Sequence, residues 1–344
     1  MLKYLLAVST ALVLTSAGAQ AQCASLATAT VGPISFVSAV TAATAPNPMA
    51  LVYNPTRSLY YLFYGGNSSY PVEVFSATGM RLTTVSPLGY DFRGVWWNPT
   101  TSQLEGNGYS NASIVAKPLD ASGYPVATTI TTIFAAGNGL SMQNVGTYDP
   151  VNNEMVYYSG GTIKRTSRAT NATVASAAVT GLPVATTNLN SNVVLYTGCT
   201  GREYGLYDAV NKAVYFVSRA TNAYVGTSQL PSSAPGNTDF GVTYANGQLY
   251  LFNYTTRTWN GYTVVSGTPT AVAAPAASLP KLELLPNPAR GQVQVTGATG
   301  PVRLLDLTGR LLREQATNTV SLNGLAAGLY VVQSGTSTAR LVVE

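Results

Sequence analysis

The sequence predicts an all-β protein, and three observations support this fold class. Short apolar runs alternate with turn-forming Asn, Asp, Gly and Pro along most of the 344 residues. Similar segments of this kind recur at regular spacing in the middle of the chain. The last part, 281–344, shows apolar residues in period-2 alternation, which is the pattern of half-buried strands.

The first repeated element is a small polar tetrapeptide between two extended runs. It reads SATG, DASG, RATN and RATN, and its copies begin at Ser76, Asp120, Arg168 and Arg219. Successive copies lie 44, 48 and 51 residues apart. A four-stranded propeller blade occupies about 40–50 residues, so the spacing predicts one blade for each copy.

The second repeated element lies upstream in the same units. Each copy has an apolar strand that ends in an aromatic residue, followed by a turn and a second strand. The aromatic residues are Tyr53, Trp97, Tyr148, Tyr207 and Tyr244. Five copies predict a β-propeller of five blades within 22–268, with six blades as the main alternative. In the fifth copy, Asn246-Gly247 is typical of a tight hairpin turn.

One alternating segment, Ile34–Val40, belongs to no unit, and the fifth unit lacks an outer strand. We expect this segment to supply that strand, because closing the ring removes free strand edges. Cys23 and Cys199 are the two cysteines of the chain. Either they form a disulfide that holds the closing strand, or Cys199 is a buried apolar side chain and Cys23 stays unpaired.

We expect the recurring aromatic residue of each unit to pack between neighbouring blades as part of the core. A different cluster, Tyr60, Tyr61, Tyr64 and Tyr70, crowds around a Gly-Gly-Asn loop at 65–67. Some of these four tyrosines are expected to face water. Their rings, among neutral polar neighbours, would suit stacking on sugar rings.

The segment 281–344 predicts a second, small β unit at the end of the chain. Its three notable motifs are PNPARG at 286–291, VRLLDLTGRLLRE at 302–314 and LAAGLYVVQ at 325–333. Alternating apolar residues in each run offer one face to a core, and Gly309 marks a hairpin turn between two of the strands.

In order, spacing and position, these motifs resemble the C-terminal type A sorting domain of cargo of the bacterial type IX secretion system. The resemblance rests on Pro286, Asn287, Pro288, Gly291, Asp306, Gly309, Gly328 and Tyr330. It implies an immunoglobulin-like sandwich that engages the type IX machinery and directs the protein across the outer membrane. It also implies removal of the domain, after which the protein is released or anchored to surface lipopolysaccharide.

The segment 1–21 has the pattern of a secretory signal peptide. Lys3 precedes an apolar run at 4–14, and small residues up to Ala21 provide a cleavage site. The run is too short to span a bilayer and no later stretch is long enough, so we expect no transmembrane segment. An uncharged Ala- and Pro-rich stretch at 269–280 is the expected linker. Both ends of the chain predict a protein that passes through the periplasm and is secreted or displayed at the cell surface.

A polar site is expected at the mouth of the propeller channel, near the starts of the innermost strands. The candidate ligand-binding residues there are Asp91, Arg93, Glu203 and Asp239. If the three carboxylates converge on the axis, their oxygens could hold a hard cation such as Ca²⁺. The alternative is that each carboxylate caps a turn or pairs with a neighbouring arginine, and the protein then has neither a metal nor a cofactor.

Composition excludes several classes of function. The chain contains no histidine, which excludes Ser-His and Cys-His catalysis and imidazole metal sites. Two cysteines cannot build a zinc cluster. Only 9% of residues are charged, and the lysines and arginines are scattered, so nucleic acid is not an expected partner.

Two functional hypotheses follow. The first is a non-catalytic propeller that binds a glycan or a protein. The second is a metal-dependent hydrolase or lyase, similar to propeller lactonases, with carboxylates at the channel mouth. The missing histidines, the few carboxylates and the lack of a nucleophile motif favour the first hypothesis, with no catalytic residues.

Overall fold

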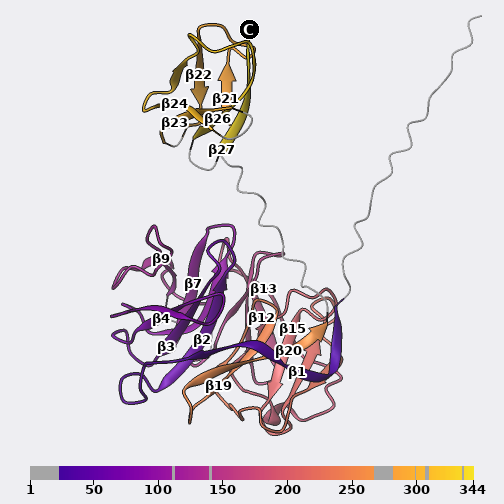
Figure 1. Cartoon of the computed structure of the whole chain (residues 1–344). Coiled ribbons are helices and arrows are strands. Elements are labelled where there is room, and N and C mark those ends of the chain that lie inside the picture. The colour runs from indigo at the N-terminus through magenta and orange to yellow at the C-terminus, as the bar shows by residue number, and fades with distance from the viewer. Residues whose placement is uncertain are drawn as a thin grey trace, which may run out of the picture. The chain divides into compact units, whose positions relative to one another are not determined.

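The computed structural model of the protein describes residues 23–110, 113–138, 142–266, 282–298, 300–306, 310–334 and 337–344. The chain divides into two compact units, Met1–Val272 and Ala273–Glu344 (Figure 1). The described residues are almost entirely strands and turns, with one short 3-10 helix at Thr186–Asn188. The predicted signal peptide and linker lie outside these residues. Among the described residues, no helix is long and apolar enough to cross a membrane.

In the first unit, three four-stranded antiparallel sheets follow one another along the chain. The first contains β2 (Asn47–Asn54), β3 (Leu59–Gly65), β4 (Val72–Ser76) and β5 (Arg81–Val85). The second contains β6 (Phe92–Asn98), β7 (Gln103–Gly108), β8 (Ile114–Lys117) and β9 (Thr131–Phe134). The third contains β10 (Thr147–Asp149), β11 (Glu154–Ser159), β12 (Thr162–Ser167) and β13 (Thr173–Ala178). In each sheet, strands that are consecutive in sequence pair with one another.

The other described strands of this unit form one larger sheet that combines two groups. The fourth group is β14 (Leu195–Tyr196), β15 (Tyr204–Asp208), β16 (Ala213–Val217) and β17 (Tyr224–Gln229). The fifth is β18 (Val242–Ala245), β19 (Gln248–Asn253) and β20 (Thr258–Ser266). The β18–β19 hairpin turns at Asn246 and Gly247, whose φ angles of 47° and 76° suit the predicted tight turn.

The N-terminal strand β1 (Ala24–Val37) lies between the fourth and fifth groups (Figure 1). It pairs antiparallel with β20 and, at Thr28 and Gln229, parallel with β17. The prediction that Ile34–Val40 supplies the outer strand of the fifth group is therefore confirmed as far as Val37. The strand also begins earlier than predicted, so it covers the free edges of two groups at once.

Beyond β1, the chain is fixed to the first group by a buried carboxylate. Glu73 on β4 is fully buried. It accepts hydrogen bonds from the Ser38 hydroxyl (2.7 Å), the Ala39 N–H (2.9 Å) and the Tyr64 hydroxyl (2.7 Å). A carboxylate with three donors is well compensated for its burial, so this contact joins the N-terminal segment to the first group.

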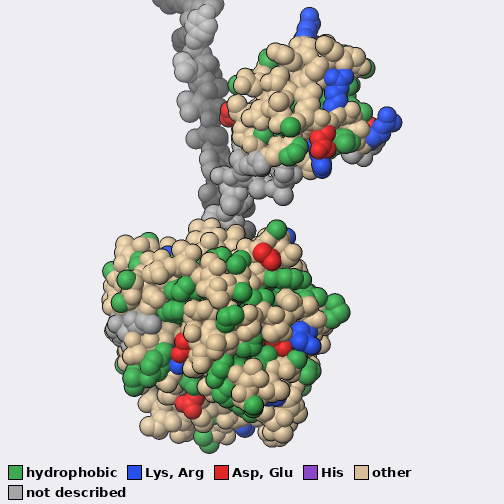
Figure 2. Space-filling model, turned by 90° about the vertical axis from the view of Figure 1, so that its left-hand side faces the viewer, with side chains coloured by type: hydrophobic (Ala, Val, Ile, Leu, Met, Phe, Trp, Pro, Cys, Tyr) green, Lys and Arg blue, Asp and Glu red, His purple; other side chains and the backbone are tan. Residues whose placement is uncertain are grey.

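The five groups form a closed ring. The first strands β2, β6, β10, β14 and β18 contact one another in succession, and β18 contacts β2. This ring of small antiparallel sheets is consistent with a β-propeller-like fold. On the face shown in Figure 2, the first unit displays few and scattered charged side chains, as the composition predicts.

The recurring aromatic residues pack between neighbouring groups, as predicted. Tyr148 on β10 stacks on Trp96 of the preceding group with ring centroids 6.3 Å apart. Tyr53 on β2 lies 4.6 Å from Tyr60 and joins a cluster that includes Phe252 of the fifth group. These contacts bury large apolar surfaces at the joints of the ring.

Tyr207 does not hold the same strand position as the other four recurring aromatic residues. It lies on β15, the second strand of its group, and Tyr196 on β14 takes the equivalent position at the end of the first strand. In the third group, the strand with the aromatic residue is β10, and three strands, β10 to β12, precede the RATN repeat. In the fourth group, the strand with Tyr207 is β15, and from this strand on only β15 and β16 precede the repeat at Arg219. The first strand of the fourth group must therefore come from further upstream.

The expectation that the tyrosine cluster on β3 partly faces water is wrong for three of its members. Tyr60, Tyr61 and Tyr64 are all at most 1% exposed, and only Tyr70 is half-buried. The edges of β3 are covered because it lies between β2 and β4 in its sheet. Its two faces are covered because its side chains pack with residues of the second and fifth groups. These side chains are core residues and are not available to a ligand.

The arginines of the RATN repeats link adjacent groups. Arg168 binds Glu105 of the preceding group through two bonds, Nε–Oε2 at 2.6 Å and Nη2–Oε1 at 2.8 Å. Arg219 contacts Glu154 of its preceding group in the same manner, at 3.3 and 2.8 Å. The repeat therefore carries an interaction between groups as well as a turn.

The second unit contains two sheets. One has β21 (Glu283–Leu285), β22 (Gln292–Thr296) and β25 (Thr319–Ser321), and the other has β23 (Val302–Leu305), β24 (Leu311–Gln315), β26 (Gly328–Ser334) and β27 (Ser337–Val343). Their inward residues form one apolar core of their own. Strands β23 and β24 form the predicted hairpin, but Gly309 at its turn lies outside the described residues.

The PNPARG motif binds the last strand of the second unit. The Asn287 side chain donates to the Arg340 carbonyl at 2.8 Å and accepts from the Val342 N–H at 2.9 Å. Ala289 continues this contact through its N–H to the Val342 carbonyl at 2.9 Å. Gly291, with φ of 76°, makes the turn into β22. The motif thus closes an otherwise free edge of β27.

Candidate ligand-binding cavity

A central cavity of about 610 Å³ lies inside the ring of the first unit. The first strands of all five groups supply half of its lining residues. The others come from the segments just before and after these strands, from the start of β19 and from β20. The cavity is therefore a product of ring closure, and no single group contains it.

A repeated aromatic pattern lies at one end of the cavity, where the five first strands end. Each first strand ends in or next to an aromatic residue that lines the cavity, and the residue two positions later also lines it. These pairs are Tyr53 and Pro55, Trp97 and Pro99, Tyr148 and Pro150, Tyr196 and Gly198, and Tyr244 and Asn246. The second residue of each pair lies just beyond the end of its strand. This end of the cavity, which we call the mouth, is therefore lined by aromatic residues from all five groups and by prolines from three.

The aromatic side chains turn their carbon atoms, rather than their polar atoms, toward the cavity. Trp97 and Tyr244 are only partly buried, yet the indole Nε1 and the phenol oxygen are buried and have no hydrogen-bond partner among the described residues. The Tyr148 hydroxyl is bonded to Asn153 at 2.8 Å. What these residues offer a ligand is thus apolar ring surface.

The cavity wall is uncharged. The described lining residues include no Asp, Glu, Lys or Arg. Burial and the nearby charge of Glu105 raise the pKa of Tyr148 to about 12, and burial also raises the pKa of Tyr244. Both phenols are therefore neutral at neutral pH. The polar groups of the wall are hydroxyls and amides, among them those of Thr147 and Gln248.

Asp91 and Arg93, two of the predicted site residues, lie at the start of β6 and pair with each other. Asp91 also accepts the Gly66 N–H at 2.6 Å, and Arg93 donates from Nε to the Gln143 side chain at 2.8 Å. Arg93 is 5% exposed. This arrangement matches the alternative reading of a carboxylate paired with a neighbouring arginine.

Asp91, Glu203 and Asp239 do not converge on one site. Asp91 precedes β6 and Asp239 precedes β18, but Glu203 lies beside Thr197, where β14 has ended. Glu203 is therefore at the opposite end of the ring, and its oxygens accept the N–H groups of Gly201 (2.8 Å) and Arg219 (2.9 Å). The described residues contain no group of three or more potential acidic or cysteine ligands for a metal.

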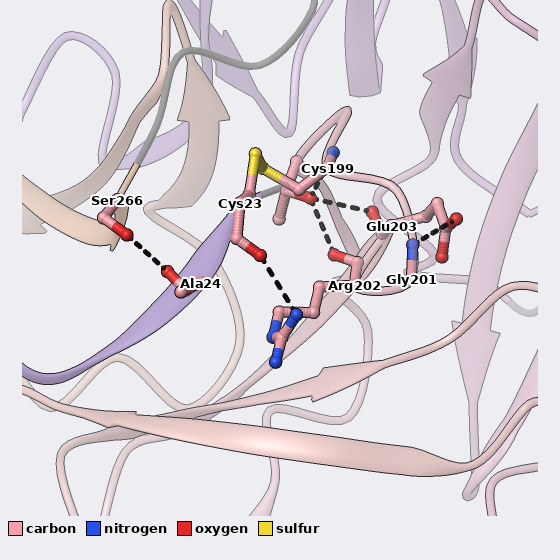
Figure 3. Close-up of a disulfide and its surroundings, with 8 residues drawn as sticks. Cys23, Ala24, Cys199, Gly201, Arg202, Glu203 and Ser266 are labelled. Carbon is pink, nitrogen blue, oxygen red and sulfur yellow. Dashed lines mark hydrogen bonds between the residues drawn. A yellow bond between two sulfur atoms is a disulfide. The ribbon is translucent and has the colours of Figure 1, made fainter. Parts of the chain in front are cut away.

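Cys23 and Cys199 form a disulfide next to the cavity mouth (Figure 3). Both side chains are buried. The neighbouring Gly198 lines the cavity, as does Ser266, whose hydroxyl donates to the Ala24 carbonyl at 3.3 Å. The disulfide thus fixes the start of β1 to the segment that forms one side of the mouth.

The sequence contained a signal for this mouth. The spacing aromatic-x-Pro occurs in the first three units, at 53–55, 97–99 and 148–150. The aromatic residues of these units pack in the core, as predicted, and they also line the cavity, which was not predicted. The equivalent position in the fourth group, Tyr196, had no such signal, because no proline follows it.

Comparison with known proteins identifies no family. No family model and no curated protein matches the sequence. Solved structures with partial similarity include a glutaminyl cyclase from Myxococcus xanthus, with 12% identity and a TM-score of 0.46 over 70% of this chain and 98% of that one. PorZ, a surface component of the type IX secretion system of Porphyromonas gingivalis, has 14% identity and a TM-score of 0.31 over 86% and 52% of the two chains. A putative 6-phosphogluconolactonase from Bacteroides uniformis has 14% identity and a TM-score of 0.35 over 83% and 90%. These values are too low to transfer an activity to this protein.

Proposed function

We propose that this protein is a type IX secretion cargo whose first unit, a five-bladed β-propeller, acts outside the cell as a non-catalytic binding module. The uncharged cavity with its aromatic mouth is the observation that carries the binding role. Concave, mostly apolar sites with a few neutral polar groups are typical of ligand binding. Nucleophilic catalysis by a hydroxyl needs a base that activates it, and the wall hydroxyls have no Asp, Glu or Lys among the described lining residues.

The alternative function, a metal-dependent hydrolase or lyase, has less support. It requires Asp91, Glu203 and Asp239 to share one site, and Glu203 is at the other end of the ring. Asp91 is already neutralised by Arg93. A hard cation would have too few charged oxygen ligands at either end.

A calcium titration distinguishes the two functions. We expect the melting temperature of the protein to be the same in Ca²⁺ and in EDTA, and we expect no EDTA-sensitive hydrolysis of a lactone. The Asp239→Asn variant should behave as the wild type, and Asp120→Asn, at an exposed turn, is the matched control for loss of one carboxylate. Stabilisation by Ca²⁺ that disappears in Asp239→Asn would instead support the hydrolase.

We also propose that 281–344 is the sorting domain, with an immunoglobulin-like sandwich fold, and that it engages the type IX machinery. The separate core of the second unit and the contact of Asn287 with β27 support a compact module in which the PNPARG motif has a structural role. A first unit exported in this way is released or held at surface lipopolysaccharide. The disulfide is in keeping with passage through the oxidising periplasm.

Deletion of 281–344 tests the export route. We expect the truncated protein to accumulate in the periplasm, folded, because the described part of the first unit has cores that include no residue of the second. Cell fractionation with protease treatment of intact cells measures its location, and resistance of the extracted protein to protease checks its fold. Surface or medium levels equal to those of the full chain would contradict the proposal.

A further inference from the structure

We propose that the cavity of the first unit binds a neutral carbohydrate, whose terminal sugar units enter through the aromatic mouth. This inference rests on the proposed binding function and names its ligand class. Its basis is the combination of ring surfaces, uncharged hydroxyl and amide groups, and a concave space of suitable size in one place.

The described cavity wall offers no partner to a charged ligand. A carboxylate, sulfate or ammonium group in the cavity would lose its water and find no described Asp, Glu, Lys or Arg on the wall. Burying an unpaired charge is costly. The wall therefore selects against charged ligands, which include acidic saccharides and charged peptides.

The cavity wall combines aromatic carbon with neutral polar groups. The wall also carries neutral polar groups, among them the Gln248 amide and the Thr263 hydroxyl, which bond each other at 2.9 and 3.0 Å. A wholly apolar ligand gains nothing from such groups and keeps water from them, whereas a ligand with hydroxyls can join their hydrogen bonds. A neutral sugar has both a flat C–H face, which packs on aromatic carbon, and hydroxyls that exchange hydrogen bonds with such groups. Trp97 and Tyr244 supply the aromatic carbon, because their polar atoms are buried.

The cavity also has a suitable volume and a wall that is fixed before binding. A volume of about 610 Å³ lies within the range of about 300–1,000 Å³ that is usual for small-ligand sites. The mouth is built on the ends of strands and on tight turns, and the Cys23–Cys199 disulfide fixes one side of it. A wall that is fixed before binding loses little entropy when the ligand enters.

Tryptophan fluorescence of the whole secreted chain tests the proposal. Two of the three tryptophans, Trp96 and Trp97, line the cavity, and Trp259 is fully buried in a cluster with Phe36. We expect neutral trisaccharides such as cellotriose, maltotriose and chitotriose to include at least one that changes the fluorescence saturably. Trigalacturonic acid and 3′-sialyllactose should bind at least about tenfold more weakly.

Cavity-filling variants locate the site. Thr147→Phe is designed to place an aromatic ring in the cavity, because Thr147 is a lining residue. We expect this variant to bind saccharide more weakly by more than about tenfold. Val151→Phe, at a position that is 60% exposed in the turn after β10, is the matched control and should bind as the wild type. Ser266→Phe blocks the mouth from an exposed position, so it gives the same test if Thr147→Phe does not fold.

Three results would overturn the carbohydrate assignment. They are the absence of any fluorescence change with the neutral trisaccharides, equal or tighter binding of the acidic ones, and unchanged binding in a folded cavity-filling variant. A charged or peptidic probe that binds in the cavity would also refute the assignment, yet it would leave the binding module intact. Metal-dependent lactone hydrolysis, in contrast, would refute the module itself.

Discussion

Replacement of Cys23 and Cys199 by serine is expected to lower the free energy of unfolding by about 3–5 kcal/mol. The bond joins residues separated by 176 positions. A link across so long a loop greatly restricts the unfolded chain, and this restriction is the main source of disulfide stability in the chain-entropy account. The effect here has a second component, because Ala24, the first residue of β1, directly follows Cys23.

The structural consequence is a weaker attachment of β1 to the two groups that it joins. Without the disulfide, β1 is held by its ladder with β20, the single bridge to β17 and the Glu73 contacts. Detachment of β1 exposes edges on two groups at once. We therefore expect the serine variant to show earlier proteolysis near the N-terminus as well as a lower unfolding midpoint.

Denaturant unfolding of the wild type, the reduced wild type and the double serine variant measures the effect. The reduced wild type and the variant should shift by similar amounts. Because Gly198 borders the cavity, the same samples should bind saccharide more weakly. If reduction leaves the midpoint unchanged, Cys199 acts only as a buried apolar side chain.

Arg168→Ala is expected to destabilise the protein by about 3–5 kcal/mol. Glu105 is fully buried, and Arg168 is its partner of opposite charge. The remaining donors to the Glu105 carboxylate are Asn98 at 3.1 Å, Thr101 at 3.0 Å and Trp96 at 3.4 Å. They are neutral, so the variant leaves a buried charge without a counter-charge, which is the costly way to break an ion pair.

The second RATN repeat supplies a matched control. Glu154 retains Arg165 at 3.5 Å when Arg219 is replaced, and the Arg219 side chain is 25% exposed against 16% for Arg168. Arg219 also lies 3.4 Å from the buried Asp149, but Asp149 keeps its hydrogen bonds from the N–H groups of Val151 and Asn152 and from the Asn152 amide. Arg219→Ala should therefore cost less than Arg168→Ala.

Thermal or urea unfolding of these variants, together with Glu105→Gln/Arg168→Ala, measures the coupling. The double variant should be more stable than Arg168→Ala alone, because the unpaired charge is gone. Equal losses in Arg168→Ala and the double variant would mean that the unpaired charge of Glu105 is not the source of the cost, and no loss in any variant would mean that the repeat contributes only its turn.

Much of the fold could be predicted from the sequence, because it follows from local patterns. Alternating apolar runs, four of the five aromatic strand ends and the Asn246-Gly247 turn depend on a few neighbouring residues, and they form the expected strands and turn. The repeat spacing predicted similar units in succession, and the described residues form small antiparallel sheets one after another. The two cysteines and the unassigned segment at Ile34–Val40 indicated how the ring closes.

The sequence alone thus determined the all-β class, the repeating units and the uncharged character of the surface, since these depend on composition and on neighbours in the chain. The tertiary structure decided the site. Which residues meet on the axis depends on strand register and direction. These placed Glu203 beside the end of β14, near Tyr196 and the aromatic mouth, and left Asp91 and Asp239 before the starts of β6 and β18, at the opposite end of the ring. The cavity exists only where five separate strands converge, and the packing of whole groups determines that convergence.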